Sequence, residues 1–508
     1  MSPSLARVAS AFRRKIWVGT SLLVVTACAS APPQAARKPD GRSEQAVARQ
    51  LDQIFNAPIT DHALWAVEVK SLDTGRVWYA RNPRTLVMPA SNMKIVTLAA
   101  AAETLGWDHR FKTTLETIGT IENGVLRGDL IIRGGGDPTI NKRNDRATAV
   151  FDEWAAALKA AGITRIAGNV VGDATRFHPI GLGQGWSWDY LEAGYAAPAS
   201  ALEFNENIAT LSIAPGAKPG DDAPLQLAVG AGLGLVHHVV TGAPGTPTRI
   251  NLRRLPEGGW LDVAGSIASD AQPVTRDVAV ARPALYFAHS TLTALVARGL
   301  QVQGLPKEEP VWLNTMVAPR TSIVLAETSS PPLRDIATTM MKVSQNLYAE
   351  TLLRAIGTVK STEPASADAG LDAARAVFTN WGIPANSYVL ADGSGLSRYD
   401  FVTADMIVRI LERLHSDPRH RDTFVATLPI AGKDGTISTR MRATRAEGNA
   451  IAKTGSIANV RALSGYVKTR EGETLVFAII GNNFTVPAAT ITWMSDLAVE
   501  TLANAGRR

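Results

Sequence analysis

Three short motifs, widely separated in the sequence, constrain the fold of this chain more than any other feature. The motifs are Ser91-Asn92-Met93-Lys94, Ser344-Gln345-Asn346 and Lys453-Thr454-Gly455, and each occurs once. By chance, a chain of this composition would contain the first two about once each and the third about 0.1 times, so their context decides what they mean. A fold in which they act together must bring residues up to about 360 positions apart into one site.

The segments around the motifs have clear secondary-structure patterns. Alternating apolar residues on either side of Asp73-Thr74-Gly75 predict a β-hairpin over 64–79. A helix is expected to follow, beginning near Pro89, ending at Gly106 and carrying Ser91 in its first turn. Further helices are expected over 333–355, 371–381, 404–414 and 488–503, and strands over 451–456, 463–468 and 475–482. The second motif therefore falls in a helical region and the third on a strand.

Between residues 107 and 315 the sequence changes character, because short β-like runs are separated by Gly and Pro. At 508 residues with 45% hydrophobic side chains, the chain is long enough for roughly three packed domains. The predicted organisation is a tether over 29–47, an α/β domain formed by 48–106 and 316–508, an inserted domain of 107–205 and 275–315, and a nested β domain of 206–274.

The first 28 residues resemble a bacterial secretory signal peptide. Four basic residues precede an apolar run over 16–27, which is too short to span a bilayer core that needs about 20 residues. The run ends in Val25-Thr26-Ala27-Cys28, which resembles a lipobox. We therefore expect Cys28 to be lipidated and the protein to be exported to the periplasm, anchored to a membrane. The alternatives are an incidental cysteine and, through Arg13-Arg14, a twin-arginine signal.

The nominal net charge of +6 does not indicate a nucleic-acid partner. Without the first 28 residues, 48 basic side chains face 46 acidic ones, a difference of +2. Because Cys28 is the only cysteine, the chain can form no internal disulfide.

The residue types in the motifs suit acyl transfer through a serine ester. Ser91 and Lys94 are three positions apart on a helix and share a face, so the amine could take the proton of the hydroxyl. For this the pKa of Lys94 must fall, and we expect burial together with the positive charge of Lys453 to lower it. A backbone N–H at Ser91 and another near Ser456 could stabilise the oxyanion.

The other two motifs could complete this reaction. Ser344 could relay a proton to the leaving group and Asn346 could hold a substrate amide. Lys453 and Thr454 could bind a substrate carboxylate. Ordinary structural roles are also open to these residues: a helix cap, a solvated helix surface and a charge at a strand edge. The presence of all three motifs in this order favours the catalytic interpretation.

The ordered motifs are those of the penicillin-recognising serine enzymes. Five further segments narrow the resemblance: Arg133-Gly134-Gly135-Gly136-Asp137-Pro138-Thr139, Gly168-Asn169-Val170, Gly185-Trp186-Ser187-Trp188-Asp189, Asp392-Gly393-Ser394-Gly395-Leu396-Ser397-Arg398 and Asp434-Gly435-Thr436. Together with the insertion of about 250 residues after the first motif, they make the chain resemble the low-molecular-mass class C penicillin-binding proteins, the peptidase S13 family, over about 50–505.

The resemblance implies a fold, an activity and partners. The fold would be α/β, with a penicillin-recognising, serine transpeptidase-like (β-lactamase-like) domain interrupted by a large, mainly β insertion of two nested domains. The activity would be that of a D-alanyl-D-alanine carboxypeptidase that also acts as an endopeptidase on peptidoglycan cross-links. The partners would be stem peptides ending in D-Ala-D-Ala and inhibitory β-lactam antibiotics, with no metal or organic cofactor.

The resemblance also implies roles for individual residues. Those expected to carry catalysis are Ser91 as nucleophile, Lys94 as general base, Ser344, Asn346 and Lys453. Those expected to bind substrate are Thr454, Gly455 and Ser456 on the strand of Lys453, and Asp173, Phe177 and Arg398 around the stem-peptide side chain. Gln345 departs from the Asp that is common at the middle of the second motif, and Ala458 stands where a polar substrate contact sometimes lies.

Other functions remain open at this point. A β-lactam hydrolase would use the same acylation, but the Glu-x-x-Leu-Asn signature of class A β-lactamases is missing. A non-catalytic peptidoglycan-binding lipoprotein could retain the fold, and replacing Ser91 would distinguish binding from catalysis. Metal-dependent hydrolysis lacks an H-E-x-x-H motif, and the glycine-rich run over 230–234 has neither the spacing nor the βαβ context of a dinucleotide loop.

Overall fold

Strands from the N-terminal and C-terminal parts of the described chain lie in one antiparallel sheet. This computed structural model describes residues 41–144, 146–255, 258–309, 322–359 and 364–506. The predicted signal peptide and Cys28 lie outside the described residues, as does most of the predicted tether. In the part of the chain that is described, no helix combines the length and apolar character needed to cross a membrane.

The strand order in this sheet is β2-β1-β22-β21-β20. Its strands are β1 (Leu64–Ser71), β2 (Val77–Arg81), β20 (Ile451–Ile457), β21 (Val460–Lys468) and β22 (Thr474–Asn482). β1 pairs with β22 over its whole length, from Leu64 opposite Asn482 to Ser71 opposite Leu475. The predicted hairpin thus joins strands from the far end of the chain.

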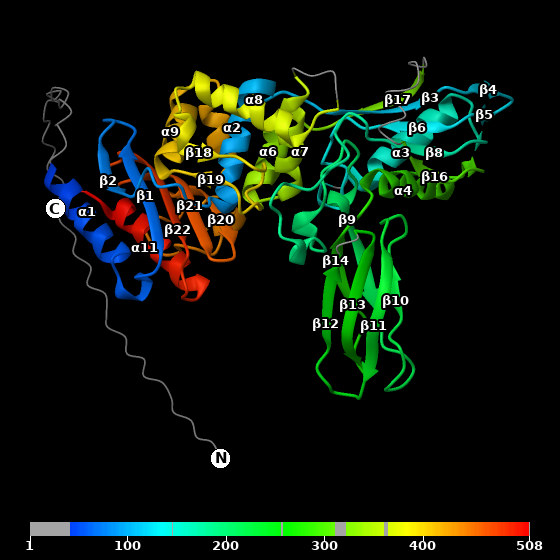
Figure 1. Cartoon of the computed structure of the whole chain (residues 1–508). Coiled ribbons are helices and arrows are strands. Elements are labelled where there is room, and N and C mark those ends of the chain that lie inside the picture. The colour runs from blue at the N-terminus through cyan, green and yellow to red at the C-terminus, as the bar shows by residue number, and fades with distance from the viewer. Residues whose placement is uncertain (1–40, 145, 256–257, 310–321, 360–363, 507–508) are drawn as a thin grey trace, which may run out of the picture. The chain divides into compact units, whose positions relative to one another are not determined.

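Helices cover both faces of the sheet (Figure 1). Because side chains alternate along a strand, Trp65, Val67 and Val69 pack with α1 (Gly41–Phe55) and α11 (Ala488–Asn504), whereas Ala66 faces the other core. That second core contains α2 (Met93–Leu105), α6 (Leu333–Lys342), α7 (Asn346–Gly357), α8 (Ala367–Asn380) and α9 (Ala404–Ser416). Packing on both faces explains why β21 is buried over most of its length and why β22 is almost continuously apolar.

The helix α2 begins inside the first motif, at Met93, and its first ten residues, 93–102, are all buried and mostly apolar. Such a helix must lie inside the protein, and four consecutive alanines at 99–102 allow its neighbours to approach closely. The predicted stop at Gly106 is confirmed, since this residue has φ of 80°. The predicted start is wrong in detail, because Ser91 lies in a 3₁₀ turn, η2 (Ala90–Asn92), that precedes α2.

Two sheets and two helices make up the first part of the inserted region. One sheet has the order β16-β8-β6-β3-β17, with strands Pro306–Glu308, Val170–Asp173, Leu130–Arg133, Lys112–Thr117 and Ile323–Ser329. The other has the order β15-β7-β5-β4, with strands Gln301–Val302, Arg165–Ile166, Val125–Arg127 and Thr120–Glu122. The helices α3 (Arg146–Ala160) and α4 (Pro283–Ala297) share their core and were not predicted from the sequence.

Six strands between residues 208 and 279 form two three-stranded sheets around a core of their own. They are β9 (Ile208–Ile213), β10 (Leu225–Leu227), β11 (Gly234–Gly242), β12 (Arg249–Arg254), β13 (Trp260–Ala268) and β14 (Val274–Ala279), and Figure 1 shows them grouped together. Residues 42–508 nevertheless divide no further into compact units, so the proposed domain boundaries stay predictions.

Candidate active site

The turn that carries Ser91 is held between two glycines. Ala90 has φ of 46°, a left-handed conformation that is uncommon for residues with a Cβ. A Cβ on Gly395 would lie 1.8 Å from the carbonyl oxygen of Ala90, and one on Gly455 would lie 2.6 Å from that of Pro89. Only glycine allows these close approaches, so the loop over 392–398 and the strand β20 together fix the position of Ser91.

Lys94 is completely buried and lies beside Ser91. Its Nζ donates to Ser91 Oγ at 2.9 Å, to Asn346 Oδ1 at 2.6 Å and to the backbone carbonyl of Ser394 at 2.8 Å. Burial lowers the pKa of Lys94 to about 7, although the carboxylates of Asp392 and Glu350 act in the opposite direction. A large fraction of this amine is therefore neutral near pH 7 and able to accept the proton of the serine hydroxyl.

Lys453 is the second buried lysine, on β20. Its Nζ donates to Ser344 Oγ at 2.8 Å and to the backbone carbonyl of Thr454 at 2.9 Å. Burial, and then the charge of Lys94, hold the pKa of Lys453 well below its usual range. The expectation that the charge of Lys453 helps to lower the pKa of Lys94 is not met, since burial is the only cause that lowers it, whereas the charge of Lys94 lowers the pKa of Lys453. The lowered pKa of Lys94 comes from burial.

The second motif joins these two lysines. Ser344 lies in the connection between α6 and α7, where its φ of 62° departs from the helical conformation that the sequence predicted. Gln345 caps α7 by accepting from the N–H of Leu347. Asn346 accepts from Lys94 and donates from Nδ2 to the carbonyl of Tyr195 at 2.8 Å. The three motifs thus form one connected site.

The strand that carries the third motif, β20, is an edge strand of its sheet. Thr454 Oγ1 donates to Thr436 Oγ1 at 2.8 Å, Gly455 packs on the turn of Ser91, and Ser456 is exposed. Arg398 donates to the carbonyl of Ala458 just beyond the strand, at 3.1 Å. An edge strand offers unpaired backbone groups to an extended peptide, which suits a peptide-binding site.

Three buried carboxyl groups lie behind Lys94, and sequence reasoning missed them. Glu350 accepts from the backbone N–H groups of Gly393 and Ser394 at 2.9 Å each, and pairs with Arg354. Asp392 accepts from Trp186 Nε1 at 2.8 Å and from three backbone N–H groups of its own loop. Asp400 accepts from the N–H groups that begin the same loop. These bonds hold the carbonyl of Ser394 against Lys94. The motif over 392–398 was the one sequence feature that pointed to this region, but its pattern alone did not show that Asp392 supports Lys94.

The pocket predicted around Asp173 and Phe177 is not formed by these two side chains. Asp173 is buried, pairs with Arg133 at 2.7 Å and accepts from both the N–H and the hydroxyl of Thr175. Phe177 is 1% exposed and packs in the helical core. Asp173 ends β8 opposite Arg133 of β6, and Phe177 forms an isolated β-bridge with Ala365, so both lie in the protein interior and neither presents a surface to a ligand. Arg398, in contrast, lies at the site.

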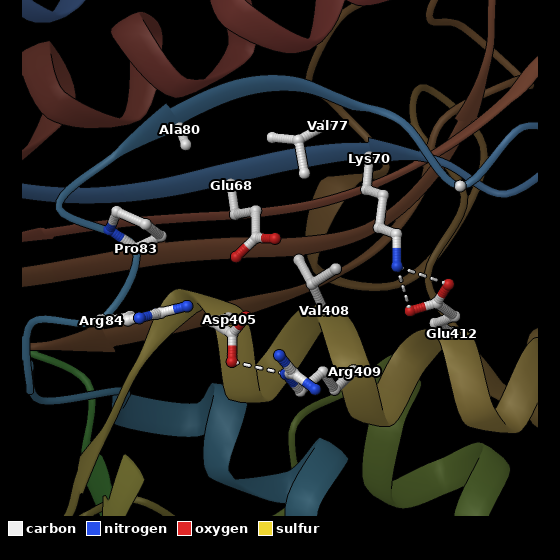
Figure 2. Close-up of a pocket in the computed structure, with 11 residues that line it drawn as sticks. Glu68, Lys70, Val77, Ala80, Pro83, Arg84, Asp405, Val408, Arg409 and Glu412 are labelled. Carbon is white, nitrogen blue, oxygen red and sulfur yellow. Dashed lines mark hydrogen bonds and ion pairs between the residues drawn. The ribbon is translucent and has the colours of Figure 1, made fainter. Parts of the chain in front are cut away.

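A surface cavity of about 380 Å³ lies between β1, β2 and α9, and no residue of the three motifs lines it (Figure 2). The ion pairs Lys70–Glu412 and Arg409–Asp405 flank the buried carboxyl group of Glu68 there. This cavity is separate from the candidate catalytic groups.

The comparison with known families decides the identity of the chain. The model of the D-Ala-D-Ala carboxypeptidase 3 (S13) family matches residues 47–503. The chain belongs to this family. Among curated proteins of similar sequence, the D-alanyl-D-alanine carboxypeptidase of Actinomadura sp. (strain R39) is 35% identical over 451 residues, which cover 86% of this chain and 81% of the relative. The D-alanyl-D-alanine carboxypeptidase DacB of Haemophilus influenzae is 29% identical, with 82% and 84% covered.

Solved structures agree with the S13 assignment. Penicillin-binding protein 4 of Haemophilus influenzae is similar with a TM-score of 0.76 and 27% identity, covering 89% of this chain and 98% of that one. A second structure of that protein, in complex with a β-lactam, has a TM-score of 0.72 and 26% identity, covering 90% of this chain and 99% of that one. The chain is a serine peptidase with the α/β fold of a low-molecular-mass class C penicillin-binding protein, which confirms the predicted family and fold class.

Proposed function

We propose that this S13 enzyme removes the terminal D-alanine of peptidoglycan stem peptides through an acyl-enzyme on Ser91. The observation that carries the proposal is the 2.9 Å contact between Ser91 Oγ and the buried, partly neutral amine of Lys94. Lys94 takes the hydroxyl proton as Ser91 Oγ attacks the carbonyl carbon of the scissile amide. The new C–O bond gives a tetrahedral intermediate.

The remaining motif residues then complete the cycle. The backbone N–H groups of Ser91 and Ser456 stabilise the oxyanion, and Ser344, backed by Lys453, passes a proton to the leaving amine as the C–N bond breaks. The proton that Lys94 took from Ser91 replaces the one that Ser344 donated, so Lys94 is neutral again when water attacks the ester. Lys94 takes the proton of that water and returns it to Ser91 Oγ as the ester C–O bond breaks, which releases the shortened peptide. Asn346 and the edge of β20 hold the substrate backbone, and Thr454 binds the terminal carboxylate. β-Lactams acylate the same serine by opening their ring.

We also propose cleavage of D-Ala cross-links. In a cross-linked peptide the leaving amine belongs to a second stem peptide rather than to free D-alanine, and the acyl-enzyme is the same. The support for this proposal is that Ser456 and Ala458, at the end of β20 beside Arg398, are exposed and so accessible to an extended leaving group.

For the location we propose export and lipid anchoring. The support is the basic and apolar pattern of residues 1–28 and the lipobox-like segment ending at Cys28. Expression of the full chain beside Cys28→Ala tests this: the wild type should fractionate with membranes and the variant should not. Equal fractionation of both forms would reject the anchor.

The central test is intact-protein mass after incubation of the exported part with benzylpenicillin. The wild type should gain one equivalent of the drug, and Ser91→Ala and Lys94→Ala should gain none. Consumption of the drug without an adduct would favour a β-lactam hydrolase. Intact drug without an adduct would favour a non-catalytic binding protein.

A further inference from the structure

The middle residue of the second motif contacts a strained segment of the inserted region. Gln345 Nε2 donates to Glu206 Oε2 at 2.7 Å. Arg143 donates to the same carboxylate, from Nε to Oε1 at 2.6 Å and from a second guanidinium nitrogen to Oε2 at 3.1 Å. Both oxygens of Glu206 are therefore occupied, and the residue is only 7% exposed. Such a bidentate, charge-assisted pair holds its geometry well.

Glu206 occupies an unfavourable backbone conformation. It is the centre of three successive residues with left-handed backbone angles: Asn205 at φ 50°, Glu206 at 58° and Asn207 at 53°. Asparagine tolerates this region of conformational space, but glutamate does so less readily. Backbone strain of this kind persists where the surroundings hold it, and it is concentrated at functional sites.

The side chain of Gln345 is matched to a carboxylate at 206. Its amide oxygen accepts from the N–H of Leu347 at the start of α7, so its amide nitrogen is left to face Glu206. An acidic residue in place of Gln345 could still cap the helix. It would, however, bring two carboxylates within hydrogen-bonding distance of each other, which is unfavourable in a buried setting. The neutral amide suits this particular neighbour.

We propose that Glu206 is a positioning residue for the second motif. Anchored by Arg143, it holds Gln345 and so orients the turn that presents Ser344 to Lys453 and Asn346 to Lys94. The inference rests on the proposed acylation of Ser91, and it makes the inserted region part of the catalytic apparatus. Catalytic groups must be held to within a fraction of an ångström, so a loosened turn costs rate more than binding.

The test is the kinetics of acylation by a fluorescent penicillin, which separates the acylation rate constant from the half-saturation concentration. Gln345→Glu should lower the rate constant about 10- to 100-fold, with the half-saturation concentration nearly unchanged. The double variant Glu206→Gln/Gln345→Glu exchanges amide and carboxylate across the contact. It should recover part of the lost rate constant, because the hydrogen bond across the contact is restored in the opposite sense, while Arg143 keeps only a neutral partner.

A matched control is Glu203→Gln, in the same segment. Burial raises the pKa of Glu203 to about 8, so this side chain is mostly a neutral acid at pH 7 and the amide replaces it closely. Its contacts go to Thr351 and Ser200 rather than to the second motif. The control variant should therefore acylate like the wild type.

The outcomes are distinct. Two results would overturn the positioning role, provided that the wild type acylates. One is a Gln345→Glu variant that acylates normally, and the other is a double variant as slow as the single one. Failure of the wild type to acylate would instead reject the proposed function. If Gln345→Glu does not fold, Glu206→Ala is the alternative variant, because it keeps the helix cap of Gln345. A lower acylation rate constant at an unchanged melting temperature would support the positioning role of Glu206, and an unchanged rate constant would reject it.

Discussion

At the scale of single residues, two buried lysines set the chemistry of this site. Each donates to a serine hydroxyl, Lys94 to Ser91 and Lys453 to Ser344, and Lys94 also donates to Asn346 of the second motif. A lysine is a useful base at neutral pH only where the protein destabilises its charged form. Here burial in the packed helical core does so, while the carboxylates behind Lys94 limit the shift.

The pKa of about 7 for Lys94 predicts the pH dependence of acylation. Only the neutral amine can accept the proton of Ser91, and the neutral fraction grows as pH rises. The acylation rate constant should therefore increase about tenfold from pH 5 to 6 and level off above pH 7 to 8. Stopped-flow measurement with a chromogenic cephalosporin between pH 5 and 9 checks this. A rate that is flat or falls over pH 5 to 7 would exclude Lys94 as the base.

At the scale of elements, glycines allow the loop over 392–398 and β20 to touch the turn of Ser91. Gly395→Ala is the sharpest probe, because Gly395 has φ of 78° and its new Cβ would lie 1.8 Å from the carbonyl oxygen of Ala90. We expect a loss of about 3 kcal/mol or more in the free energy of unfolding, and acylation at least about tenfold slower. The matched control is Gly382→Ala, which has a similar φ of 69° but no atom near its Cβ. It should cost about 1 kcal/mol and leave acylation unchanged. Equal effects of the two substitutions in chemical denaturation would contradict the packing explanation.

The packing of β1 on α9 buries a carboxyl group that lowers the free energy of unfolding in a pH-dependent way. Glu68 projects from β1 toward α9, its Oε2 is buried without a hydrogen-bond partner among the described residues, and burial and Asp405 are the main causes that raise its pKa to about 7 (Figure 2). A carboxyl group with a raised pKa destabilises the folded state above that pKa and has no effect below its unfolded value of about 4.5. Glu68→Gln should therefore increase the free energy of unfolding by up to about 3 kcal/mol at pH 8, with the gain vanishing near pH 4. Urea unfolding at both pH values tests this, and a gain that is larger at pH 4 would refute it.

At the scale of the whole molecule, segments from opposite ends of the chain depend on one another. α11 contributes Ile491, Met494, Val499 and Leu502 to the core on one face of the sheet. Each such side chain is worth about 1.5–3 kcal/mol when buried, so the four together match a typical total stability of about 5–15 kcal/mol. A chain ending at residue 486 should therefore fail to fold and to acylate, although it retains every motif residue. Removal of residues 1–40 should leave acylation intact. Normal binding of a fluorescent penicillin by the shortened chain would disprove this dependence.

The sequence by itself determined the family, the reaction class, the helix that follows Ser91 and the strand that carries the third motif. Rare residue types at set spacings and strong hydrophobic periodicity are local properties, so a sequence can show them. Only the tertiary structure placed Ser344 in a left-handed turn, buried Asp173 and Phe177, and brought Glu206 and Tyr195 of the inserted region to the second motif. The helices α3 and α4 were missed among short β-like runs, and the carboxyl groups of Glu350 and Asp400 carried no motif of their own. The physical reason is that burial, the charge state of a lysine and contacts between segments a hundred or more residues apart depend on what packs around each group. No local pattern records those neighbours.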